Sequence, residues 1–480
     1  MSREILINVT AHEKRAAIVS EGKLEEFYIE RPQDKTIVGN IYKGKIEAVL
    51  PSIGAAFVDI GLPKKGFLYL SEIESVFEAD TGVAHVEQKE IKKGQEVLVQ
   101  VVKEAFGTKG PRLTTEIGLA GRYLVLMPGS RQIGVSRRIE DEDERRRLKA
   151  LLHEFKLPAG VGFIVRTVAS GKSKQELTHD AQFLLKLWRR LEGIIKQRKA
   201  PSVIYEEYDL TLRVIRDSFT EDISKLIVDS KSEYYRISNF MKTFLNYLRR
   251  RLELYKGDDL FLEKDIERQI ARIFESKVYM KSKAYLVIEP TEGLVVIDVN
   301  SGGFRKNISQ EEAAFKVNCE AAEEAARQLI LRNLGGIIVV DFIDMEKEFH
   351  RREVLSVLKR ALSRDKAKYD ILGISKFGVV EMTRERVHRT AQMLSFEPCP
   401  YCQGKGRIRS AVTTSIYALK ELKKFLKDKR PKEVNVTLAP SVVDEILKDK
   451  EGLRTLERQF RTKINFISLP TTHMEEVKIA

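Results

Sequence analysis

Cysteine is scarce in this chain, and long apolar runs are missing. Three cysteines among 480 residues are too few for a disulfide scaffold, and this composition favours a reducing compartment. No apolar run approaches the roughly 20 residues that span a bilayer. The first residues, MSREILINVT, contain no charged and then apolar signal segment. We therefore expect a cytoplasmic protein without disulfides and without a membrane span.

Several catalytic signatures are missing as well. The sequence contains no phosphate-binding loop of the GxxxxGK[ST] kind, which argues against a P-loop nucleotide hydrolase. Its seven histidines show no metal-ligand spacing, and no Ser/His/Asp or Cys/His arrangement is indicated.

Positive charge is present in excess. The formal net charge is +14 and the isoelectric point about 9.3, while 32% of the residues are charged and 43% are hydrophobic. A chain of this length and composition predicts several globular domains. The surplus charge favours a polyanionic partner such as nucleic acid, although a heat-adapted surface rich in Lys and Glu would give the same balance.

Five short strands are predicted between residues 42 and 119, with glycines between them. This pattern is typical of a small closed barrel of the OB type, which often binds single-stranded nucleic acid through exposed aromatic rings and nearby cations. The candidates for stacking on bases and for holding the backbone are Tyr42, Phe57, Phe67, Lys43, Lys64, Lys65 and Lys109. From the pattern alone, a place in the barrel core is slightly favoured for each phenylalanine.

The rest of the chain alternates between strand-like and helical patterns. A β-rich stretch over 120–172 precedes a helix predicted over 174–199, before Pro201. Residues 411–480 predict a helix, a strand, two short helices and a strand, which is a small α/β module. This module could bind RNA or enlarge a contact between subunits.

Two β-branched runs, residues 293–303 and 335–345, read as central strands that are covered on both faces. The amphipathic segment between them begins with the capping-box pair Ser309 and Glu312. A strand–helix–strand unit crosses over right-handedly and lays its two strands parallel. Asp298 and Asp341, near the ends of the two strands, are therefore expected side by side at one sheet edge.

Two neighbouring carboxylates at such an edge predict a cation site. Their mutual repulsion is relieved by a hard divalent ion, and oxygen ligands select Mg²⁺ or Mn²⁺. Asn300 lies on the same strand face as Asp298, and Asp344 is a weaker fourth member. With a basic surface nearby, this arrangement suits phosphodiester hydrolysis. The alternative is that each aspartate caps the loop after its strand.

Basic residues follow this unit. Five of them could line a phosphate path, although each one alone is more typical of a solvated surface charge: Lys366, Lys368, Lys376, Arg384 and Arg386.

Cys399 and Cys402 form half of a zinc-binding motif. A closed zinc site needs four ligands, and Cys319 lies inside the predicted helix, where we expect a small buried hydrophobe. The same pair from a second chain would complete a Cys₄ site across a two-fold axis, and Gly404 and Gly406 favour such a knuckle. A redox Cys-x-x-Cys and an empty remnant are the alternatives.

Seven runs resemble the ribonuclease E/G family over nearly the whole chain. They are NIYKGKIEAVLPSIGAAFVDIG, LTTEIGLAGRYLVLMPG, SRRIE, VRTV, TEGLVVIDVNSGGF, EAARQLILRNLGGIIVVDFIDM and CPYCQGKG. INVT, VGNIYKG and AAFVDIGL are more similar to the G branch than to the E branch, and we expect a short member without the long Pro-rich scaffold of the E branch.

The resemblance implies a multidomain α/β and α+β fold. An RNase H-like domain, residues 1–35 and 212–276, is split around an S1-type OB barrel, 36–118, and a 5′-sensor module, 119–211. A DNase I-like α/β domain, 277–397, a zinc-link, 398–410, and a small dimerisation domain, 411–480, follow. It further implies zinc shared between two protomers of a dimer or tetramer.

The resemblance also implies an activity: Mg²⁺-dependent cleavage of single-stranded A/U-rich RNA to 5′-phosphate products, in rRNA and tRNA processing and mRNA turnover. Asp298 and Asp341 would hold the metal, supported by Asn300. The positions that would contact RNA on the barrel are Phe57, Phe67 and Lys109. Those that would bind an RNA 5′-monophosphate are Gly121, Val125, Arg138, Arg166 and Thr167.

The chain departs from the family pattern in two places. Val317-Asn318-Cys319 stands where the family usually has Thr-Asn before the Glu-Ala-Ala of the crossover helix. Lys366 and Lys368 stand in a basic turn where an arginine is common, and a lysine cannot make the bidentate contact of an arginine. Two other functions compete with RNA cleavage: a non-catalytic, zinc-bridged RNA-binding or ribosome-associated factor, and a phosphodiesterase acting on DNA.

Overall fold

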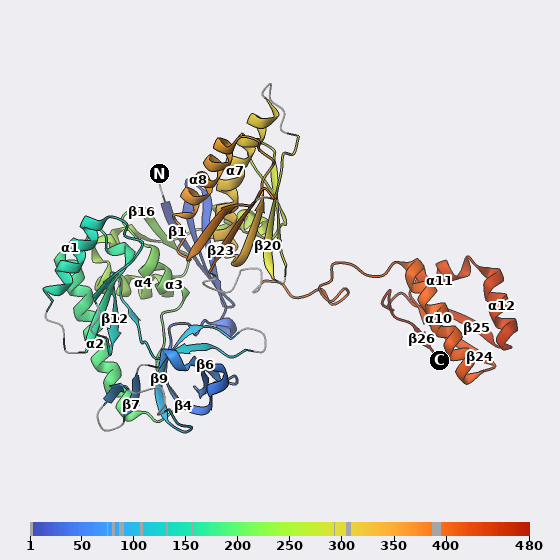
Figure 1. Cartoon of the computed structure of the whole chain (residues 1–480), viewed down its shortest axis with the longest axis horizontal. Helices are drawn as coiled ribbons and strands as arrows, with labels where there is room; N and C mark the ends of the chain where they lie inside the picture. The colour runs from blue at the N-terminus through green and yellow to red at the C-terminus, as the bar shows by residue number, and fades with distance from the viewer. Residues whose placement is uncertain are drawn as a thin grey trace. The chain divides into compact units, whose positions relative to one another are not determined.

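The computed structural model describes residues 3–73, 75–78, 82–85, 91–105, 109–130, 133–155, 158, 160–291, 293–303, 309–375, 377–385 and 395–480. The chain divides into two compact units, Met1–Gln392 and Met393–Ala480, each with its own core (Figure 1). Among the described residues, no helix has the length and apolar character needed to cross a membrane.

The first sheet of the larger unit is built from two distant stretches of chain. Its strands, in the order β17-β16-β1-β2-β3, are β17 (Leu252–Leu254), β16 (Ile223–Val228), β1 (Arg3–Val9), β2 (Lys14–Ser20) and β3 (Lys23–Glu30). Strands β1, β16 and β17 are parallel, whereas β2 runs antiparallel to both of its neighbours. Apolar side chains on both faces are covered, on one by α3 (Leu210–Ser218) and α4 (Lys231–Phe244), on the other by α5 (Leu260–Glu263) and α6 (Ile266–Ile273).

The predicted five-stranded barrel is confirmed. Its strands are β4 (Ile41–Leu50), β5 (Ala55–Asp59), β6 (Gly66–Tyr69), β10 (Arg112–Thr114) and β9 (Glu96–Lys103), and pairing of β9 with β4 closes it. A Cβ at Gly66 would lie 2.3 Å from a methyl carbon of Leu113, so only glycine allows this strand to approach so closely. The strand β15 (Ser202–Tyr205) pairs with β4, and β7 (Ser75–Glu78) pairs with β8 (Gly82–His85).

A four-stranded sheet with two helices follows the barrel. Its strands, in the order β11-β12-β14-β13, are β11 (Leu119–Ala120), β12 (Leu124–Pro128), β14 (Val161–Val165) and β13 (Ile133–Val135), and its helices are α1 (Glu142–His153) and α2 (Lys174–Gln197). The helix predicted over 174–199 is thus confirmed by α2, which opens with a capping box between Ser173 and Glu176. Its apolar side buries Trp188 and four leucine and isoleucine residues in one core with the sheet.

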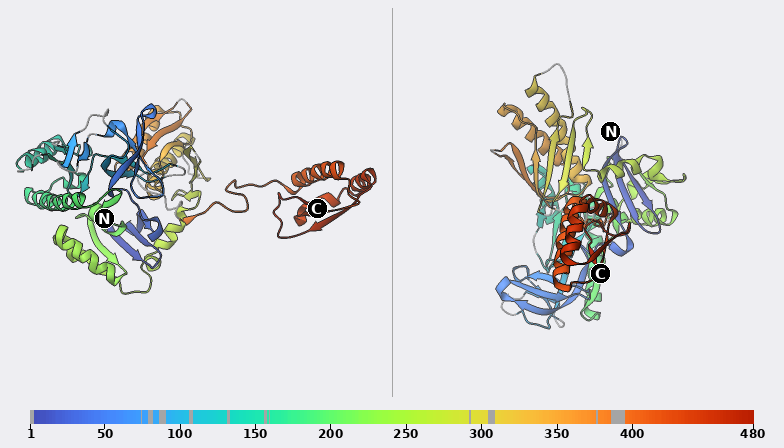
Figure 2. Two further views of the ribbon diagram at one scale, coloured as in Figure 1. Left: turned by 90° about the horizontal axis from the view of Figure 1, so that it is seen from below. Right: turned by 90° about the vertical axis from the view of Figure 1, so that its right-hand side faces the viewer.

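The last sheet of the larger unit confirms the predicted strand–helix–strand unit. Its order is β18-β19-β20-β21-β23-β22, and its strands are β18 (Lys277–Tyr279), β19 (Tyr285–Pro290), β20 (Leu294–Asn300), β21 (Gly336–Asp341), β23 (Val379–Arg384) and β22 (Tyr369–Ile374). Only β20 and β21 are parallel, joined by α7 (Gln310–Leu331), which begins at the predicted cap Ser309. Figures 1 and 2 show α7 and α8 (Glu348–Leu362) on the same side of this sheet.

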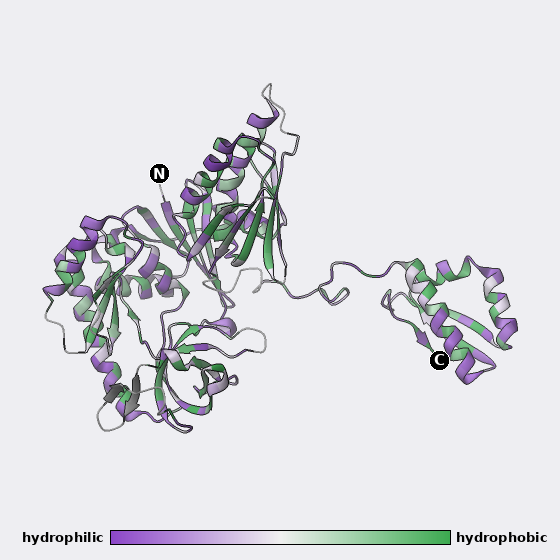
Figure 3. Ribbon diagram, viewed as in Figure 1, coloured by the Kyte–Doolittle hydropathy of each residue, from purple (hydrophilic) through white to green (hydrophobic). Residues whose placement is uncertain are grey.

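Burial alternates along these strands. In β20 and β21, the buried side chains Val295, Ile297, Val299, Ile338 and Val340 pack in the core with α7 and α8. The residues between them are partly or fully exposed and form the open face of the sheet. Figure 3 shows the hydrophobic character of the strands, which the helices cover from one side.

The smaller unit has the predicted order of elements. These are α10 (Ala411–Lys429), β24 (Glu433–Leu438), α11 (Pro440–Leu447), α12 (Lys450–Phe460) and β25 (Lys463–Ser468), with β26 (Lys478–Ile479) as an additional edge strand. Strands β24 and β25 are parallel, and their apolar residues pack against α10 and α11.

Candidate active site

The two candidate metal ligands lie directly opposite each other. Asp298 on β20 is the register partner of Asp341 on β21, so adjacent strands, about 4.8 Å apart, carry the two carboxylates. Both residues are exposed on the open face. Asn300 lies two residues further along the same face and donates its amide Nδ2 to Asp298 Oδ2 at 2.7 Å. The structure therefore brings together the three residues that the sequence predicted.

The electrostatics of this edge favour a cation. The pKa of Asp341 is raised, first by burial and then by the negative charges of Asp298 and Asp344. Asp344 lies near the turn that precedes β23. Its Oδ1 is 3.7 Å from the position that a Cβ atom would occupy if Gly378 had a side chain. Among the described residues, no set of three or more His, Cys, Asp or Glu is arranged to hold a metal. Mg²⁺ commonly uses one or two carboxylates and keeps waters and substrate phosphates as its other ligands, so this pair fits it.

Asn318 fixes the segment that follows Asp341. This fully buried side chain of α7 donates Nδ2 to the Ile343 carbonyl at 2.7 Å and accepts from the Ile343 amide at 3.0 Å. Both hydrogen bonds are to the backbone between Asp341 and Asp344. A polar amide on the buried side of an amphipathic helix is the sequence signal that could have identified this residue.

A second contact from α7 holds the end of the same segment. Glu311 accepts hydrogen bonds from the backbone amides of Glu346 and Lys347, at 2.8 and 3.1 Å, and its Oε1 lies 2.6 Å from His350 Nδ1. These amides, then His350, lower the pKa of Glu311 to about 2. The His350 ring stacks on Phe315 with 4.3 Å between centroids. Residues 342–347 are thus tied to the crossover helix at both ends.

The barrel presents aromatic side chains on its outer surface. Phe57 and Phe67 are register partners, are partly exposed and lie outside the barrel core, with centroids 5.9 Å apart. Phe67 also meets Tyr69 edge-on at 4.9 Å. Lys109 is exposed. The core interpretation of the two phenylalanines is therefore wrong.

Three other barrel residues that were predicted to contact RNA make contacts within the protein instead. Tyr42 is 3% exposed and belongs to the barrel core, so its predicted stacking role is wrong. Lys43 is buried and bonds to the carbonyls of Ile195 and Arg198 and to Glu96, which contradicts a contact with an RNA backbone. Lys65 pairs with Glu47 and Asp59. The sequence pattern predicted the strands but not which face each side chain occupies.

The candidate 5′-phosphate residues lie around the start of β12 and the end of β14. Arg166 donates Nη1 to the Gly121 carbonyl at 2.7 Å, and Val125 on β12 is paired with Ile164 on β14. Thr167 Oγ1 lies 3.0 Å from Ser136 Oγ. The Ser136 hydroxyl in turn accepts from the amide of Arg138, whose guanidinium donates to the Lys366 carbonyl.

Two acidic residues that the sequence reasoning missed organise this region. Asp217 accepts from Arg166 Nη2 at 2.6 Å; burial acts to raise its pKa, but Arg166 and Arg216 outweigh burial and hold the pKa well below its usual range. Asp180 is 2% exposed and accepts from the three amides of residues 122–124. A Cβ at Gly121 would lie 2.6 Å from Asp180, which explains glycine at that position.

The predicted phosphate path receives little support. Arg384 is 5% exposed and pairs with buried Asp365, so its predicted role is wrong. Lys366 bonds to Glu26 and Ser218, both at 2.7 Å, while Lys368 is exposed. Lys376 and Arg386 lie outside the described residues.

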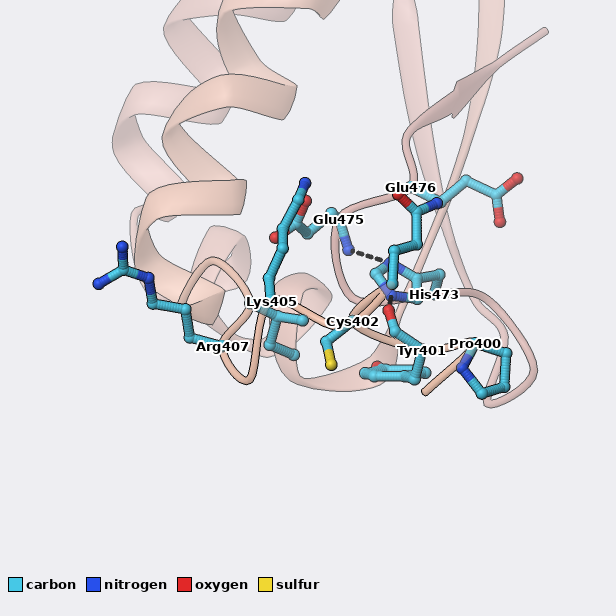
Figure 4. A pocket seen from close by; sticks show the side chains of 10 residues that line it. Pro400, Tyr401, Cys402, Lys405, Arg407, His473, Glu475 and Glu476 are labelled. Atoms are coloured by element: carbon cyan, nitrogen blue, oxygen red, sulfur yellow. Dashed lines mark hydrogen bonds between the residues drawn. The ribbon is translucent and has the colours of Figure 1, made fainter. Parts of the chain in front are cut away.

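The cysteine knuckle belongs to the smaller unit. Cys399 is exposed, and hydrogen bonds from the amides of Cys402 and Tyr401 and from the Cys402 thiol lower its pKa. Tyr401 connects the knuckle to the turn before β26: its carbonyl accepts from His473 Nε2 at 2.5 Å, and its hydroxyl accepts from the Met474 amide at 3.2 Å. Tyr401, His473 and Cys402 line a pocket of about 260 Å³. Figure 4 shows their side chains next to one another.

The third cysteine lies on α7 of the larger unit. Cys319 is partly buried against the core of the last sheet, and burial raises the pKa of its thiol to about 11. All three cysteines are free thiols.

Three regions of the chain match known families. The Ribonuclease E/G family matches residues 118–387, and the S1 RNA binding domain matches residues 35–116. The chain belongs to the ribonuclease E/G family. Residues 398–480 match the RNase E/G thioredoxin-like domain, which places the cysteine knuckle and the small C-terminal α/β module in one matched region.

Relatives in both branches of the family support this assignment. The chain is 42% identical over 438 residues to Ribonuclease G of Escherichia coli (strain K12), covering 88% of each protein. It is 42% identical over 429 residues to Ribonuclease G of Haemophilus influenzae, covering 87% of each. Ribonuclease E of the same organism is 39% identical in an alignment of 484 positions, which covers 98% of this chain and 51% of that protein. The chain is therefore an endoribonuclease with an RNA-binding S1 domain.

The two hydrogen bonds from Asn318 predict a measurable effect. Asn318→Ala leaves the amide and carbonyl of Ile343 unpaired and loosens the segment after Asp341. Under the proposal below, which assigns Mg²⁺ to the two aspartates, we expect the half-saturating Mg²⁺ concentration for RNA cleavage to rise about tenfold. Excess Mg²⁺ should restore much of the rate.

A matched control comes from the same helix. Gln328 is 3% exposed and bonds to Glu324 and Arg332, away from the aspartates. Gln328→Ala should lower the unfolding temperature without changing the Mg²⁺ requirement. If Asn318→Ala and Gln328→Ala had the same half-saturating Mg²⁺ concentration, Asn318 would have no influence on the site.

Proposed function

We propose that the chain is a Mg²⁺-dependent endoribonuclease that cleaves single-stranded, A/U-rich RNA and prefers substrates with a 5′-monophosphate. It acts in rRNA and tRNA processing and in mRNA turnover. The proposal rests on one observation: Asp298 and Asp341 face each other on parallel strands at the open face of a sheet. Mn²⁺ is a possible substitute, because both ions prefer oxygen ligands.

Each residue of the site has a distinct part in the reaction. Asp298 and Asp341 would hold Mg²⁺, and the amide of Asn300 keeps the Asp298 carboxylate in one orientation. When bound, the ion supplies an activated water and offsets negative charge on the phosphorane-like transition state. Asn318 and Glu311 keep the backbone after Asp341 in place, so the two carboxylates need little rearrangement to bind the ion. The product carries its 5′-phosphate on the downstream fragment.

The barrel supplies a binding surface for single-stranded RNA. Phe57 and Phe67 offer two partly exposed ring faces on adjacent strands, and stacking on such rings tolerates any base. The exposed ammonium group of Lys109 would contact the phosphate backbone, which adds a salt-dependent contribution to affinity.

The 5′-monophosphate would bind beside Arg166 and Thr167. A guanidinium and a hydroxyl, with backbone amides nearby, match a phosphate monoester. Asp217 and the Gly121 carbonyl fix the Arg166 guanidinium from one side, which orients it before the ligand arrives. Val125 and Arg138 would complete the pocket, whose size would disfavour a 5′-triphosphate.

The finer domain assignments belong to the same proposal. The sheet of β1, β2, β3, β16 and β17 is formed by segments on either side of the barrel, as a split RNase H-like domain requires. The sheet with β20 and β21 would be the DNase I-like catalytic domain, and residues 119–211 would form the 5′-sensor.

Zinc would connect two copies of the chain. Cys399 and Cys402 offer two thiolates in an exposed knuckle, and the left-handed backbone of Gly404 and Gly406 lets its amides turn toward the sulfurs. Since no third ligand is arranged beside them among the described residues, the same pair from a second protomer would complete Cys₄. The assembly would be a homodimer, or a tetramer of two such dimers.

Removal of a metal carboxylate tests the activity. Asp298→Asn or Asp341→Asn should lower cleavage of a 5′-phosphorylated A/U-rich oligoribonucleotide at least 100-fold, because an amide is a poor ligand for a hard cation. RNA binding in the presence of a chelator should be unchanged. Asp370→Asn, which alters an exposed carboxylate on β22 of the same sheet, is the control and should cleave normally. Wild-type rates in both site variants would refute the metal assignment.

Arg166→Ala tests the phosphate pocket. The ratio of cleavage rates for 5′-monophosphate over 5′-hydroxyl RNA should fall several-fold, since a charge-assisted contact to the phosphate is lost. A general loss of stability would lower both cleavage rates by the same factor and would leave their ratio unchanged. Arg146→Ala changes an exposed arginine on α1 and should keep the wild-type ratio. A ratio that Arg166→Ala leaves unaltered would exclude this residue from the pocket.

Cys402→Ser tests the shared zinc. Zinc content and assembly state, followed by metal analysis and light scattering, should fall together, because a hydroxyl replaces a thiolate ligand. Cys319→Ala removes the cysteine outside the knuckle and should change neither. One full zinc per chain in an isolated monomer would contradict sharing.

A further inference from the structure

Two tyrosines lie beside the aspartate pair on the open sheet face. In the antiparallel pairing of β19 with β20, Tyr285 is the partner of Asn300, and in the pairing of β18 with β19, Tyr279 is the partner of Tyr285. Directly opposed residues project from the same face of a sheet. Asn300, Tyr285 and Tyr279 therefore form a row across three strands, and this row begins at the residue that orients Asp298.

The two rings are not part of a core. Tyr279 is 68% exposed and Tyr285 is partly exposed, whereas Leu286 and Ile288, the alternate residues of β19, are buried against the helices. The ring centroids lie 5.7 Å apart with a 53° tilt. A core tyrosine would face α7, but these rings face away from it.

A cation completes the row. Lys277, the first residue of β18, is exposed and places its ammonium 4.4 Å from the centroid of the Tyr285 ring. This cation–π contact keeps the positive charge next to the exposed aromatic surface. The adjacent tyrosine rings and lysine give the combination that single-stranded nucleic acid recognises: ring faces for bases and a cation for phosphates.

We propose that Tyr285, Tyr279 and Lys277 form a nucleotide-binding subsite for single-stranded RNA next to the scissile phosphate. This proposal rests on the proposed cleavage site at Asp298 and Asp341. Adjacent strands are about 4.8 Å apart, so Tyr285 lies one strand, and Tyr279 two strands, from the strand that carries Asp298. The base beside the cleaved bond stacks on Tyr285, and the next base reaches Tyr279.

The choice of RNA as the occupant follows from charge and continuity. The row runs directly into the site where this endoribonuclease must place a phosphodiester, and the chain carries a net charge of +14. The barrel phenylalanines lie on a different sheet, whereas the row shares its sheet with the two aspartates. A subsite here would hold the RNA on the catalytic sheet itself and bring its backbone to the carboxylates.

Substitution of Tyr285 tests the subsite. The probes are 5′-phosphorylated A/U-rich oligoribonucleotides, each with one 2-aminopurine at a different position around the cleavage site, bound in the presence of a chelator. Tyr285→Ala should weaken binding about tenfold and abolish the fluorescence quenching at one position, because a stacking partner is lost. Tyr285→Phe keeps the ring and should retain both properties. Tyr279→Ala should affect the neighbouring position.

A matched control is available on a helix that packs against the first sheet. Tyr235 on α4 is 56% exposed and contacts Tyr234, so Tyr235→Ala removes an exposed ring that is not near the aspartates. It should leave binding and quenching unchanged. Wild-type binding by Tyr285→Ala would overturn the proposal, and so would equal losses in Tyr285→Ala and Tyr285→Phe.

The remaining outcomes are also informative. A change in assembly state with unaltered RNA binding would overturn the proposal and make this face a contact between subunits. The binding measurement contains no divalent cation, so a wrong metal assignment would appear only in the cleavage of the Asp298→Asn and Asp341→Asn variants. A failed subsite and a failed cleavage site are therefore distinguishable.

Discussion

The parallel pairing of β20 with β21 is the constraint on which the catalytic proposal depends. It places Asp298 opposite Asp341, although the crossover helix α7 separates them in the chain. Apolar residues on one face of both strands pack against α7 and α8, and this packing turns the two carboxylates to the other face. A shift of one residue in register would send one carboxylate into the core. Hydrophobic burial thus sets the geometry of a polar site.

The crossover helix has a second role, because it also fixes the backbone beyond the strand. Asn318 and Glu311 use side-chain oxygens and an amide to satisfy backbone groups in residues 342–347. A buried amide that lost these partners would cost free energy, so the segment has one preferred conformation. The same helix therefore supports the site from the buried side, while the opposite face of the sheet exposes the two aspartates and the Tyr285 row.

Sequence patterns predicted the elements of this fold better than the surroundings of single residues. The β-branched runs, the cap at Ser309 and the glycine-separated strands predicted the parallel pair and the closed barrel, because periodicity and turn chemistry act locally. The burial of Tyr42 and the pairing of Arg384 with Asp365 depend on contacts between distant segments, which no local pattern records. For Asn318, helical periodicity could place the amide on the buried side of α7, but its partner Ile343 lies outside the helix and no local pattern records that contact.

The central claim is that Asp298 and Asp341 hold one divalent cation, and anomalous diffraction tests it most directly. Crystals soaked in Mn²⁺ and measured near the manganese absorption edge should show a single strong peak in contact with oxygens of both carboxylates. The peak should disappear in Asp341→Asn crystals that diffract equally well. Wild-type crystals with no peak at this edge of the sheet, or with a peak that neither carboxylate contacts, would contradict the account.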